Sequence, residues 1–191
     1  MAQGKTSRRS KAAGEAQTAS GRASDAQTAD RRASDAARGV GVRVRAVRQA
    51  DLPQVIALDA TVTGLHKSDY RQRVYRRYGV GGQGLRHFLV AVDGARVVGF
   101  VIGEVRDWEF GSPPCGWVFA IDVDPRARLA GIGTALLGAV RERFRQVGVT
   151  MLRTMLSRDN QLLLSFFRSQ GLTAGHLIPL QIEIETGAAG A

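Results

Sequence analysis

The fold is decided by residues 123–137, VDPRARLAGIGTALL. An apolar segment, residues 118–123, precedes this stretch, and a segment with the helical spacing of apolar residues follows it. Gly131 and Gly133 carry no side chain, so backbone N–H groups can approach a ligand closely there. A helix that begins at these glycines leaves its first N–H groups without partners and has the positive end of its dipole there. The stretch therefore predicts an anion site suited to a phosphate or a pyrophosphate.

Two better-known phosphate-binding motifs are absent. The pattern GxxxxGK followed by Ser or Thr does not occur, which excludes a P-loop. The dinucleotide fingerprint requires a third glycine or an alanine, and the sequence has Leu136 at that position. A glycine pair can also be only a structural helix cap, and that alternative stays open on these residues alone.

A wider pattern extends the motif on both sides. Val-x-Pro-x-x-Arg-x-x-Gly-x-Gly-x-x-Leu-Leu resembles the acetyl-CoA motif of the GNAT superfamily of N-acetyltransferases, and Arg128, Gly131 and Gly133 match its core. A second stretch that begins at Asn160, Asn-x5-Phe-Phe-x3-Gly-Leu, resembles the motif that the family carries on its last helix. The resemblance covers residues 42–186, which we interpret as a GNAT acetyltransferase domain.

The resemblance implies an enzyme. Such proteins move an acetyl group from acetyl-CoA, the co-substrate, to a primary amine of a small molecule or a protein by direct attack, without a metal. The alternative is a catalytically weak GNAT-like module that binds acyl-CoA and has an interaction or sensing role through a basic tail. Phe167 favours this alternative, because the family has a tyrosine there that protonates the leaving thiolate, and a phenyl ring cannot donate a proton.

The resemblance also implies which residues contact the co-substrate. The strand before the glycine loop would separate from its parallel neighbour, so that its free backbone groups bind the pantetheine arm and the acetyl carbonyl. The N–H groups of the loop would bind the pyrophosphate, and the last helix would donate a hydrogen bond to pantetheine. The implied cofactor-binding residues are Ile121, Asp122, Val123, Arg128, Leu129, Ala130, Gly131, Ile132, Gly133, Thr134, Asn160 and Phe167.

Two carboxylates are candidates for the general base. The attacking amine must be neutral, so a base or a chain of water molecules has to take its proton. Asp122 interrupts the most apolar strand, where a carboxylate should be paired or functional. Glu104 lies near the end of another predicted strand. We therefore take Asp122 and Glu104 as candidate catalytic residues, with a salt bridge or an exposed position as the alternative for each.

The rest of the domain predicts an α/β fold with a mixed, mostly antiparallel central sheet and helices on both faces. Asp93-Gly94 is a strong hairpin signal between two apolar runs. The predicted strands cover residues 42–47, 87–92, 96–105, 117–123, 149–156 and 177–185. The predicted helices cover residues 51–60, 68–78, 131–147 and 159–170. The resemblance to the GNAT fold implies that the first two helices and the loop at residues 79–84 line the acceptor side. The alternative for the second helix is an ordinary exposed arginine face with Arg71, Arg73, Arg76 and Arg77.

Length and composition limit the class of protein. The chain has 191 residues, 44% of them hydrophobic, which is enough for one domain and a tail. No apolar run reaches the ~18 residues that indicate a membrane span, and the polar N-terminus lacks a signal-peptide pattern. Cys115 is the only cysteine, and the three histidines have no metal-ligand spacing. We therefore expect a cytoplasmic protein without a membrane segment, a metal or a disulfide.

The N-terminal tail differs from the domain. Residues 1–41 contain no Ile, Leu, Phe, Trp or Tyr, so they cannot bury enough apolar surface to fold and are predicted to be disordered. Eight basic and four acidic residues give the tail a charge of +4, out of +10 for the chain. The tail either contacts nucleic acid, for example on the ribosome, or is a solvated extension. Residues 187–191 are expected to be flexible, and the resemblance to GNAT domains leads us to expect a homodimer.

Overall fold

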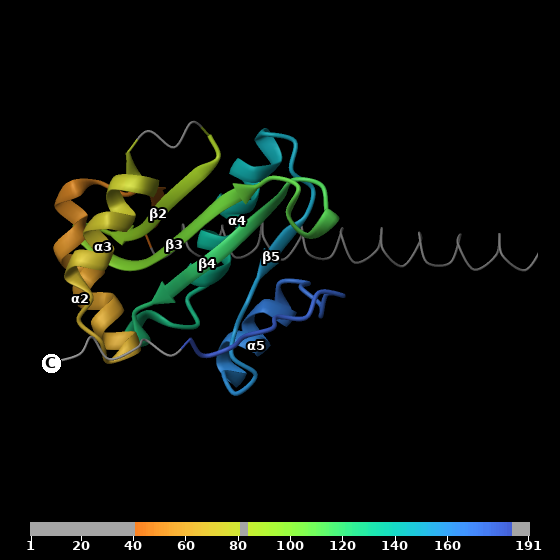
Figure 1. The fold of residues 1–191 in the computed structure, drawn as a ribbon. Helices are drawn as coiled ribbons and strands as arrows, with labels where there is room; N and C mark the ends of the chain where they lie inside the picture. Colours follow the sequence, from red (N-terminus) through yellow and green to blue (C-terminus); the bar gives the residue numbers. More distant parts are fainter. Residues whose placement is uncertain (1–40, 81–83, 185–191) are drawn as a thin grey trace, which may run out of the picture.

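The computed structural model describes residues 41–80 and 84–184 (Figure 1). Residues 1–40, which make up almost all of the predicted disordered tail, lie outside the described residues. The same holds for residues 81–83 of the glycine-rich loop and for residues 185–191 at the C-terminus. What the sequence predicts for these segments stays a prediction.

One sheet of five strands forms the centre of the domain, in the order β1-β2-β3-β4-β5. The strands are β1 (Val42–Ala46), β2 (Arg86–Asp93), β3 (Arg96–Arg106), β4 (Cys115–Val123) and β5 (Leu152–Thr154). The first four strands pair antiparallel, and β4 pairs with β5 in parallel. This arrangement confirms the predicted mixed, mostly antiparallel sheet. The hairpin between β2 and β3 is also confirmed, with Gly94 at a φ of 58° in its turn.

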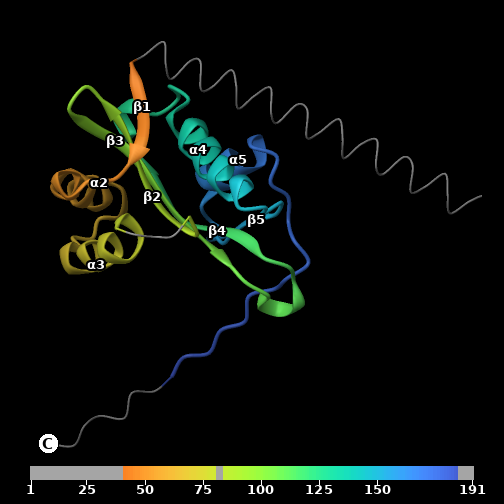
Figure 2. The same cartoon turned by 90° about the horizontal axis from the view of Figure 1, so that it is seen from above.

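Helices cover both faces of this sheet, as predicted (Figure 2). Two of them, α2 (Leu52–Thr63) and α3 (Ser68–Val74), lie on one face, and α4 (Ile132–Gln146) and α5 (Gln161–Ser169) lie on the other. The shorter turns are η1 (Gln49–Asp51), η2 (Tyr75–Gly79), η3 (Glu109–Gly111) and η4 (Pro125–Ala127). None of the described helices is long and apolar enough to cross a membrane.

Each face of the sheet buries its own apolar cluster. On the α4 face, the amphipathic spacing of the helix brings Leu136, Leu137 and Val140 into the core, where they are completely buried. On the other face, a second cluster that includes Val55 and Phe100 lies beneath α2 and α3. Strands between two covered faces have no solvent side, which explains why β2 and β3 are almost continuously apolar.

The last predicted strand, residues 177–185, is wrong over residues 177–184, which the structure describes. These residues have no regular secondary structure, and the sheet ends at β5 within the described chain. Figure 2 shows them as an extended chain that leads away from the sheet. The alternation of apolar residues predicts an extended conformation. A strand also needs a neighbouring strand that pairs with its backbone groups, and the alternation does not predict that neighbour.

Two other predicted elements differ in extent or type. Strand β5 is three residues long, much shorter than the predicted strand at 149–156. The predicted helix at 68–78 consists of α3 followed by one turn of π-helix, η2. The helices predicted on either side of β5 are confirmed as α4 and α5.

Candidate active site

Strands β4 and β5 run side by side over only three residue pairs, the last of which is Val118 with Thr154. The Thr154 hydroxyl donates a hydrogen bond to the Val118 carbonyl oxygen at 2.8 Å. Next to this point the β3–β4 register shifts, and Phe119 is the extra residue of the resulting bulge in β4. Beyond the bulge, β4 has only β3 as a neighbour among the described strands. We call residues 119–123 on the side away from β3 the open edge of β4.

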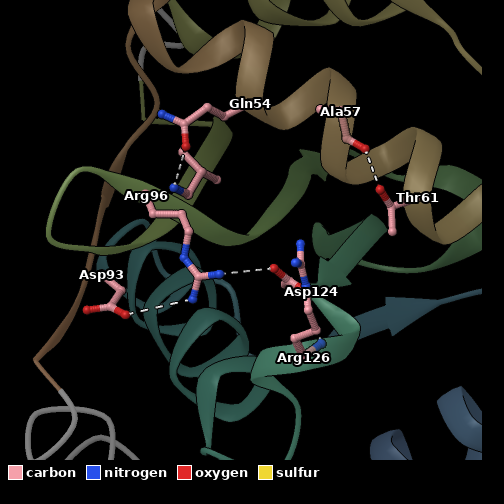
Figure 3. A network of polar contacts seen from close by, with 8 residues as sticks. Gln54, Ala57, Thr61, Asp93, Arg96, Asp124 and Arg126 are labelled. Atoms are coloured by element: carbon pink, nitrogen blue, oxygen red, sulfur yellow. Dashed lines mark hydrogen bonds and ion pairs between the residues drawn. The ribbon is translucent and has the colours of Figure 1, made fainter.

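The chain leaves β4 through a turn that the buried carboxylate of Asp124 holds in place (Figure 3). One oxygen accepts a hydrogen bond from the backbone N–H of Arg126 at 2.9 Å, and the other lies 3.5 Å from Nη1 of Arg96. The hydrogen bond from Arg126, with the charges of both arginines, holds the pKa of Asp124 below its ordinary value. Beside this turn, the Gln54 side chain accepts a hydrogen bond from the Val97 N–H at 2.9 Å and ties α2 to β3.

The loop between this turn and α4 contains two residues with positive φ, Leu129 at 67° and Gly131 at 74°. Gly131 is the N-cap of α4 and has no side chain with which to cap the helix. The first hydrogen bond of the helix is donated by the Ala135 N–H to the Gly131 carbonyl oxygen at 2.9 Å. The N–H groups of residues 132–134 precede that bond and point out of the positive end of the helix dipole. Such a helix start can bind an anion.

Helix α5 packs against this helix start. A Cβ atom on Gly133 would lie 3.1 Å from the Phe166 ring, so a larger residue there would require the ring to shift. Phe167, which the sequence predicts to face the cofactor, is 4% exposed and belongs to the core, whereas Phe166 is the ring beside the loop. The Asn160 side-chain oxygen accepts a hydrogen bond from the Leu163 N–H at 3.1 Å and caps α5.

Glu104, one of the two candidate bases, already has several partners. The Tyr78 hydroxyl donates a hydrogen bond to its carboxylate at 2.9 Å, and Nε of Arg106 donates another at 3.1 Å. Nε of Arg86 lies 3.9 Å from the same group. Burial, together with the hydrogen bond to Glu104, raises the pKa of Tyr78 above its ordinary value. The contacts favour the salt-bridge interpretation of Glu104.

Asp122, the other candidate, lies directly opposite Phe100 of β3, so its side chain is on the sheet face that α2 and α3 cover. Among the described residues, no hydrogen bond or ion pair reaches its carboxylate. Burial raises the pKa of Asp122, and the nearby positive charge of Arg71 partly opposes that rise. A half-buried carboxylate without a partner, beside the open edge of β4, is able to accept a proton from a neighbouring group.

The two carboxylates do not share one site. Glu104 lies four residues along β3 from Phe100, the residue opposite Asp122. At ~3.3 Å per residue, this separates the two positions by about 13 Å along the sheet. Asp122 is therefore the one that lies beside the open edge of β4.

A buried ion-pair cluster lies on the same face as Asp122. The Asp59 side chain is completely buried and accepts hydrogen bonds from Nη2 and Nε of Arg71 at 2.7 and 3.0 Å, and Nζ of Lys67 lies 3.2 Å away. The Arg71 guanidinium carbon lies 4.8 Å from the centre of the Phe100 ring. Burial acts to raise the pKa of Asp59, but the hydrogen bonds and charges of Arg71 and Lys67 outweigh it, so the pKa is lowered.

The sequence does not predict this cluster, and the alternative of an exposed arginine face is wrong for Arg71, which is buried. The signal was present in α2, where Asp59 follows Val55 by four residues and precedes Val62 by three. An acidic residue at a core position of a helix predicts a buried cationic partner. The partner is twelve residues away on the next helix, and no local pattern identifies it.

The described residues contain no candidate metal site. No group of three or more His, Cys, Asp or Glu side chains in the described residues is placed to hold a metal ion. The candidate site features that the structure brings together are the open edge of β4, the uncapped start of α4 and the carboxylate of Asp122.

Comparison with known proteins identifies relatives of this domain. A profile of the acetyltransferase (GNAT) family matches residues 52–172. The L-2,4-diaminobutyric acid acetyltransferase of Nocardia farcinica is 36% identical over 99 residues, which cover 52% of this chain and 49% of that protein. The mycothiol acetyltransferase of Kocuria rhizophila is 33% identical over 95 residues, which cover 48% of this chain and 31% of that protein. The chain thus spans half or less of the length of these curated relatives.

Solved structures share the fold at lower sequence identity. Aminoglycoside N-acetyltransferase AAC(6')-Iy, solved in complex with CoA, aligns with a TM-score of 0.66 and 17% identity over 74% of this chain and 94% of that one. Aminoglycoside 6'-N-acetyltransferase AAC(6')-Ih from Acinetobacter baumannii aligns with a TM-score of 0.64 and 19% identity over 76% of this chain and all of that one. At these identities the likeness shows the fold alone.

Proposed function

The chain belongs to the GNAT family of acetyltransferases, and on this premise we propose that it is an acetyl-CoA-dependent N-acetyltransferase that acts on a primary amine. One observation carries the proposal: the open edge of β4 leads directly to the uncapped start of α4. A long ligand with an anionic centre and an amide-rich arm fits such a surface. The N–H groups bind the anion, and the strand edge pairs with the amides.

The proposed binding mode uses backbone groups for most contacts. The N–H groups of residues 129–134 hold the pyrophosphate, with the Thr134 hydroxyl as a further donor and the exposed Arg128 as a nearby positive charge. The open edge of β4, at residues 121–123, pairs with the pantetheine arm. Because the Asn160 cap uses the side-chain oxygen, the Nδ2 group remains the donor for a pantetheine carbonyl.

The proposed chemistry uses Asp122 as the general base. The amine nitrogen attacks the thioester carbonyl carbon, the Asp122 carboxylate takes a proton from the nitrogen directly or through a water, and the C–S bond breaks to release the thiolate. Backbone N–H groups of the open edge stabilise the oxyanion that forms on the carbonyl oxygen. The buried Phe167 donates no proton, and a thiolate with a pKa near ~8.5 can leave without an acid.

The proposed acceptor is a small amine that does not carry many positive charges. Arg73, Arg76 and Arg77 are exposed on α3 and η2, on the same side of the sheet as Asp122. Their charges would repel a polycation and would attract an acceptor that also carries a carboxylate. The relative from Nocardia farcinica is named for 2,4-diaminobutyric acid, an amine of that kind.

The test is an acetyl-transfer assay with the full chain, acetyl-CoA and three amines: 2,4-diaminobutyrate, an aminoglycoside and spermine. We expect release of free CoA thiol, matched mole for mole by an acetylated amine in the mass spectrum, and a higher rate with 2,4-diaminobutyrate than with spermine. Binding of acetyl-CoA without transfer to any amine in a broad panel would favour the alternative, a GNAT-like binding module. Efficient acetylation of spermine would overturn the charge argument alone.

Three further predictions stay proposals. The basic tail would either contact nucleic acid, with steep loss of that contact on added salt as its signature, or be a solvated extension with no such contact. The protein would act in the cytoplasm, and the enzyme would function without a metal, so that activity persists after treatment with a chelator.

A further inference from the structure

A cavity lies at the end of the sheet where β2 begins beyond the end of β1. Ala46, the last residue of β1, pairs with Leu89, so the first residues of β2 extend past that strand. The cavity has a volume of about 200 Å³, and its lining includes Arg86 and His87 of β2 and Arg143 of α4. This volume is that of about six water molecules, so the cavity can hold a small organic molecule. We call it the β2 cavity.

His87 brings a buried hydrogen-bond acceptor to the β2 cavity. The residue is 7% exposed, and its ring packs against Phe144 with the ring centres 5.6 Å apart. The backbone of Gly84 accepts a hydrogen bond from the ring, and Nε2 is buried with no hydrogen-bond partner among the described residues. Burial and then the charge of Arg143 lower the pKa of His87, so the ring is neutral at pH 7 and Nε2 carries no proton. The cavity therefore favours an occupant with an O–H or N–H group, because a buried acceptor without a partner is unfavourable.

Arg143 brings a positive charge to the same cavity. It is half-buried near the end of α4, and within the described part of the chain no hydrogen bond or ion pair holds its guanidinium group. Its neighbour Arg145 is exposed and is already paired with Glu142, at 2.7 and 2.8 Å. Arg86 also lines the cavity, and its Nε lies 3.9 Å from Glu104. A planar guanidinium group without a partner matches a carboxylate, which it can bind through two parallel hydrogen bonds.

We infer that the β2 cavity binds a small carboxylic acid that carries a hydroxyl group beside the carboxylate, with a 2-hydroxy acid as the simplest case. Arg143 pairs with the carboxylate, and Nε2 of His87 accepts a hydrogen bond from the hydroxyl group. An ammonium group in place of the hydroxyl would be repelled by Arg86 and Arg143, so an amino acid fits this cavity less well.

The β2 cavity is separate from the proposed acetyl-CoA site. Arg143 follows Ile132, the first residue of α4, by eleven residues, which is about 16 Å along the helix axis at ~1.5 Å per residue. His87 packs against α4, whereas Asp122 lies on the opposite face of the sheet. The carboxylic acid therefore binds near the other end of the same helix. This inference does not depend on the proposed acetyl transfer.

The test is an NMR titration of the ¹⁵N-labelled full chain with lactate, propionate and 1,2-propanediol. Propionate lacks the hydroxyl group of lactate, and 1,2-propanediol lacks its carboxylate. We expect lactate to shift the Nε2 resonance of His87 and the amide resonances of residues 84–89 in a saturable way. Propionate should bind about three- to tenfold more weakly, the effect of one neutral hydrogen bond, and 1,2-propanediol at least about tenfold more weakly, because it loses a hydrogen bond to a charged group.

Three variants assign the two contacts. Arg143→Gln should weaken lactate binding at least about tenfold. Arg145→Gln makes the same charge change at an exposed position of α4 and should leave lactate binding unchanged. His87→Phe keeps a ring against Phe144 and should bind lactate and propionate equally. Thermal unfolding of each variant is the folding control, and the comparison of lactate with propionate on the wild type needs no variant.

Several results would overturn the inference. If lactate causes no saturable shift, the cavity holds water alone. Equal binding of lactate and propionate by the wild type would remove the contact with His87, and an equal loss in Arg143→Gln and Arg145→Gln would mean that charge attracts lactate without a site. Shifts confined to residues 129–134 would place lactate at the start of α4. Inorganic phosphate, which also combines a negative charge with an O–H group, would replace the carboxylic acid if it bound this cavity more tightly than lactate does.

Discussion

The two sides of the site beside β4 differ in which groups form them, backbone groups on one side and charged side chains on the other. The cofactor side, residues 124–134, is shaped by backbone hydrogen bonds, by positive φ angles and by a helix start without a side-chain cap. The acceptor side is shaped by charged side chains, with Asp122 beside the buried pair of Asp59 and Arg71. Substitutions on the cofactor side should therefore act mainly through the atoms that they add at Cα. Substitutions on the acceptor side should act mainly through the charge that they remove.

The two sides also differ in how many elements of the fold form them. The cofactor side comes from one continuous stretch of chain, whereas the acceptor side joins α2, α3 and β4. A change on the acceptor side is therefore expected to affect stability or turnover while it leaves acetyl-CoA affinity unchanged. The predictions below use that contrast, in order of decreasing effect.

The largest effect is expected for Asp122→Asn, which keeps the shape of the side chain but removes the base. We expect kcat to fall by about 10²- to 10⁴-fold, the usual contribution of a general base. The affinity for acetyl-CoA, measured by calorimetry, should not change, because the contact that we propose for Asp122 with the co-substrate is made by its backbone. Glu104→Gln is the matched control, and its kcat should fall far less, since Glu104 is held by Tyr78 and Arg106. Equal losses in both variants would remove Asp122 from its proposed role.

The next largest effect is expected for Asp59→Asn. The change leaves the guanidinium of Arg71, which is 3% exposed, without its charged partner. Breaking a buried ion pair in this way costs about 3–5 kcal/mol of unfolding free energy. Urea denaturation measures the loss, and Asp107→Asn, at an exposed position, should stay within about 0.5 kcal/mol of the wild type.

The same pair predicts how stability changes with pH. The pKa of Asp59 is lower in the folded state than in the unfolded state, so the unfolded chain binds the proton more tightly. The stabilisation is therefore fully present above the unfolded pKa and is lost as the pH falls through the folded pKa. In the Asp59→Asn variant this acidic part of the stability profile should be flatter. An unchanged slope would mean that the pair contributes nothing to acid stability.

A smaller effect is expected for Gly133→Ala on the cofactor side. The added Cβ would lie 3.1 Å from the Phe166 ring, so the ring has to move by a few tenths of an ångström. Overpacking of this kind costs about 1 kcal/mol or somewhat more. Thermal unfolding measures the cost, and the double variant Gly133→Ala/Phe166→Leu should recover part of it. A loss that the second change does not reduce would mean that the contact with Phe166 is not the cause.

The smallest effect is expected at Asn160, where two variants separate two roles. Asn160→Ala removes the cap of α5 and should cost about 1 kcal/mol of stability. Asn160→Ser keeps an oxygen that can cap the helix but lacks the Nδ2 donor. We therefore expect Asn160→Ser to retain most of the stability while its affinity for acetyl-CoA falls severalfold. An affinity equal to that of the wild type would restrict Asn160 to its structural role.

The sequence predicted the backbone-built side better than the side built from side chains. The glycine loop, the preceding strand and the following helix are adjacent in sequence, and local patterns describe them well. No local pattern predicts the ion pair between Asp59 and Arg71, because the two residues meet only when α2 and α3 pack together. The sequence does not show which of the two rings lies nearer the loop: Phe167 is buried, and the Phe166 ring lies beside Gly133, while the contact of Phe167 with the cofactor stays a prediction.

Residues 177–184 show a further limit of local patterns. The alternation in residues 177–184 correctly describes a chain with one apolar face, and the prediction of a paired strand was still wrong for the single chain. A strand needs a neighbouring strand, and the sequence of residues 177–184 does not identify which sheet edge supplies it. For both Asp122 and Glu104 the sequence leaves a catalytic role and a structural role open, and the hydrogen bond and ion pair of Glu104 favour the structural role for that residue.

Calorimetry of the full chain with acetyl-CoA tests whether the start of α4 binds the pyrophosphate, as we propose. The wild type is compared with Gly131→Glu, which puts a carboxylate at the helix start, and with Gly131→Asn, which tolerates the positive φ of this position without a charge. The account predicts micromolar binding by the wild type, retained in Gly131→Asn and lost in a folded Gly131→Glu. A folded wild type that does not bind acetyl-CoA, or a Gly131→Glu variant that binds it equally well, would contradict the account.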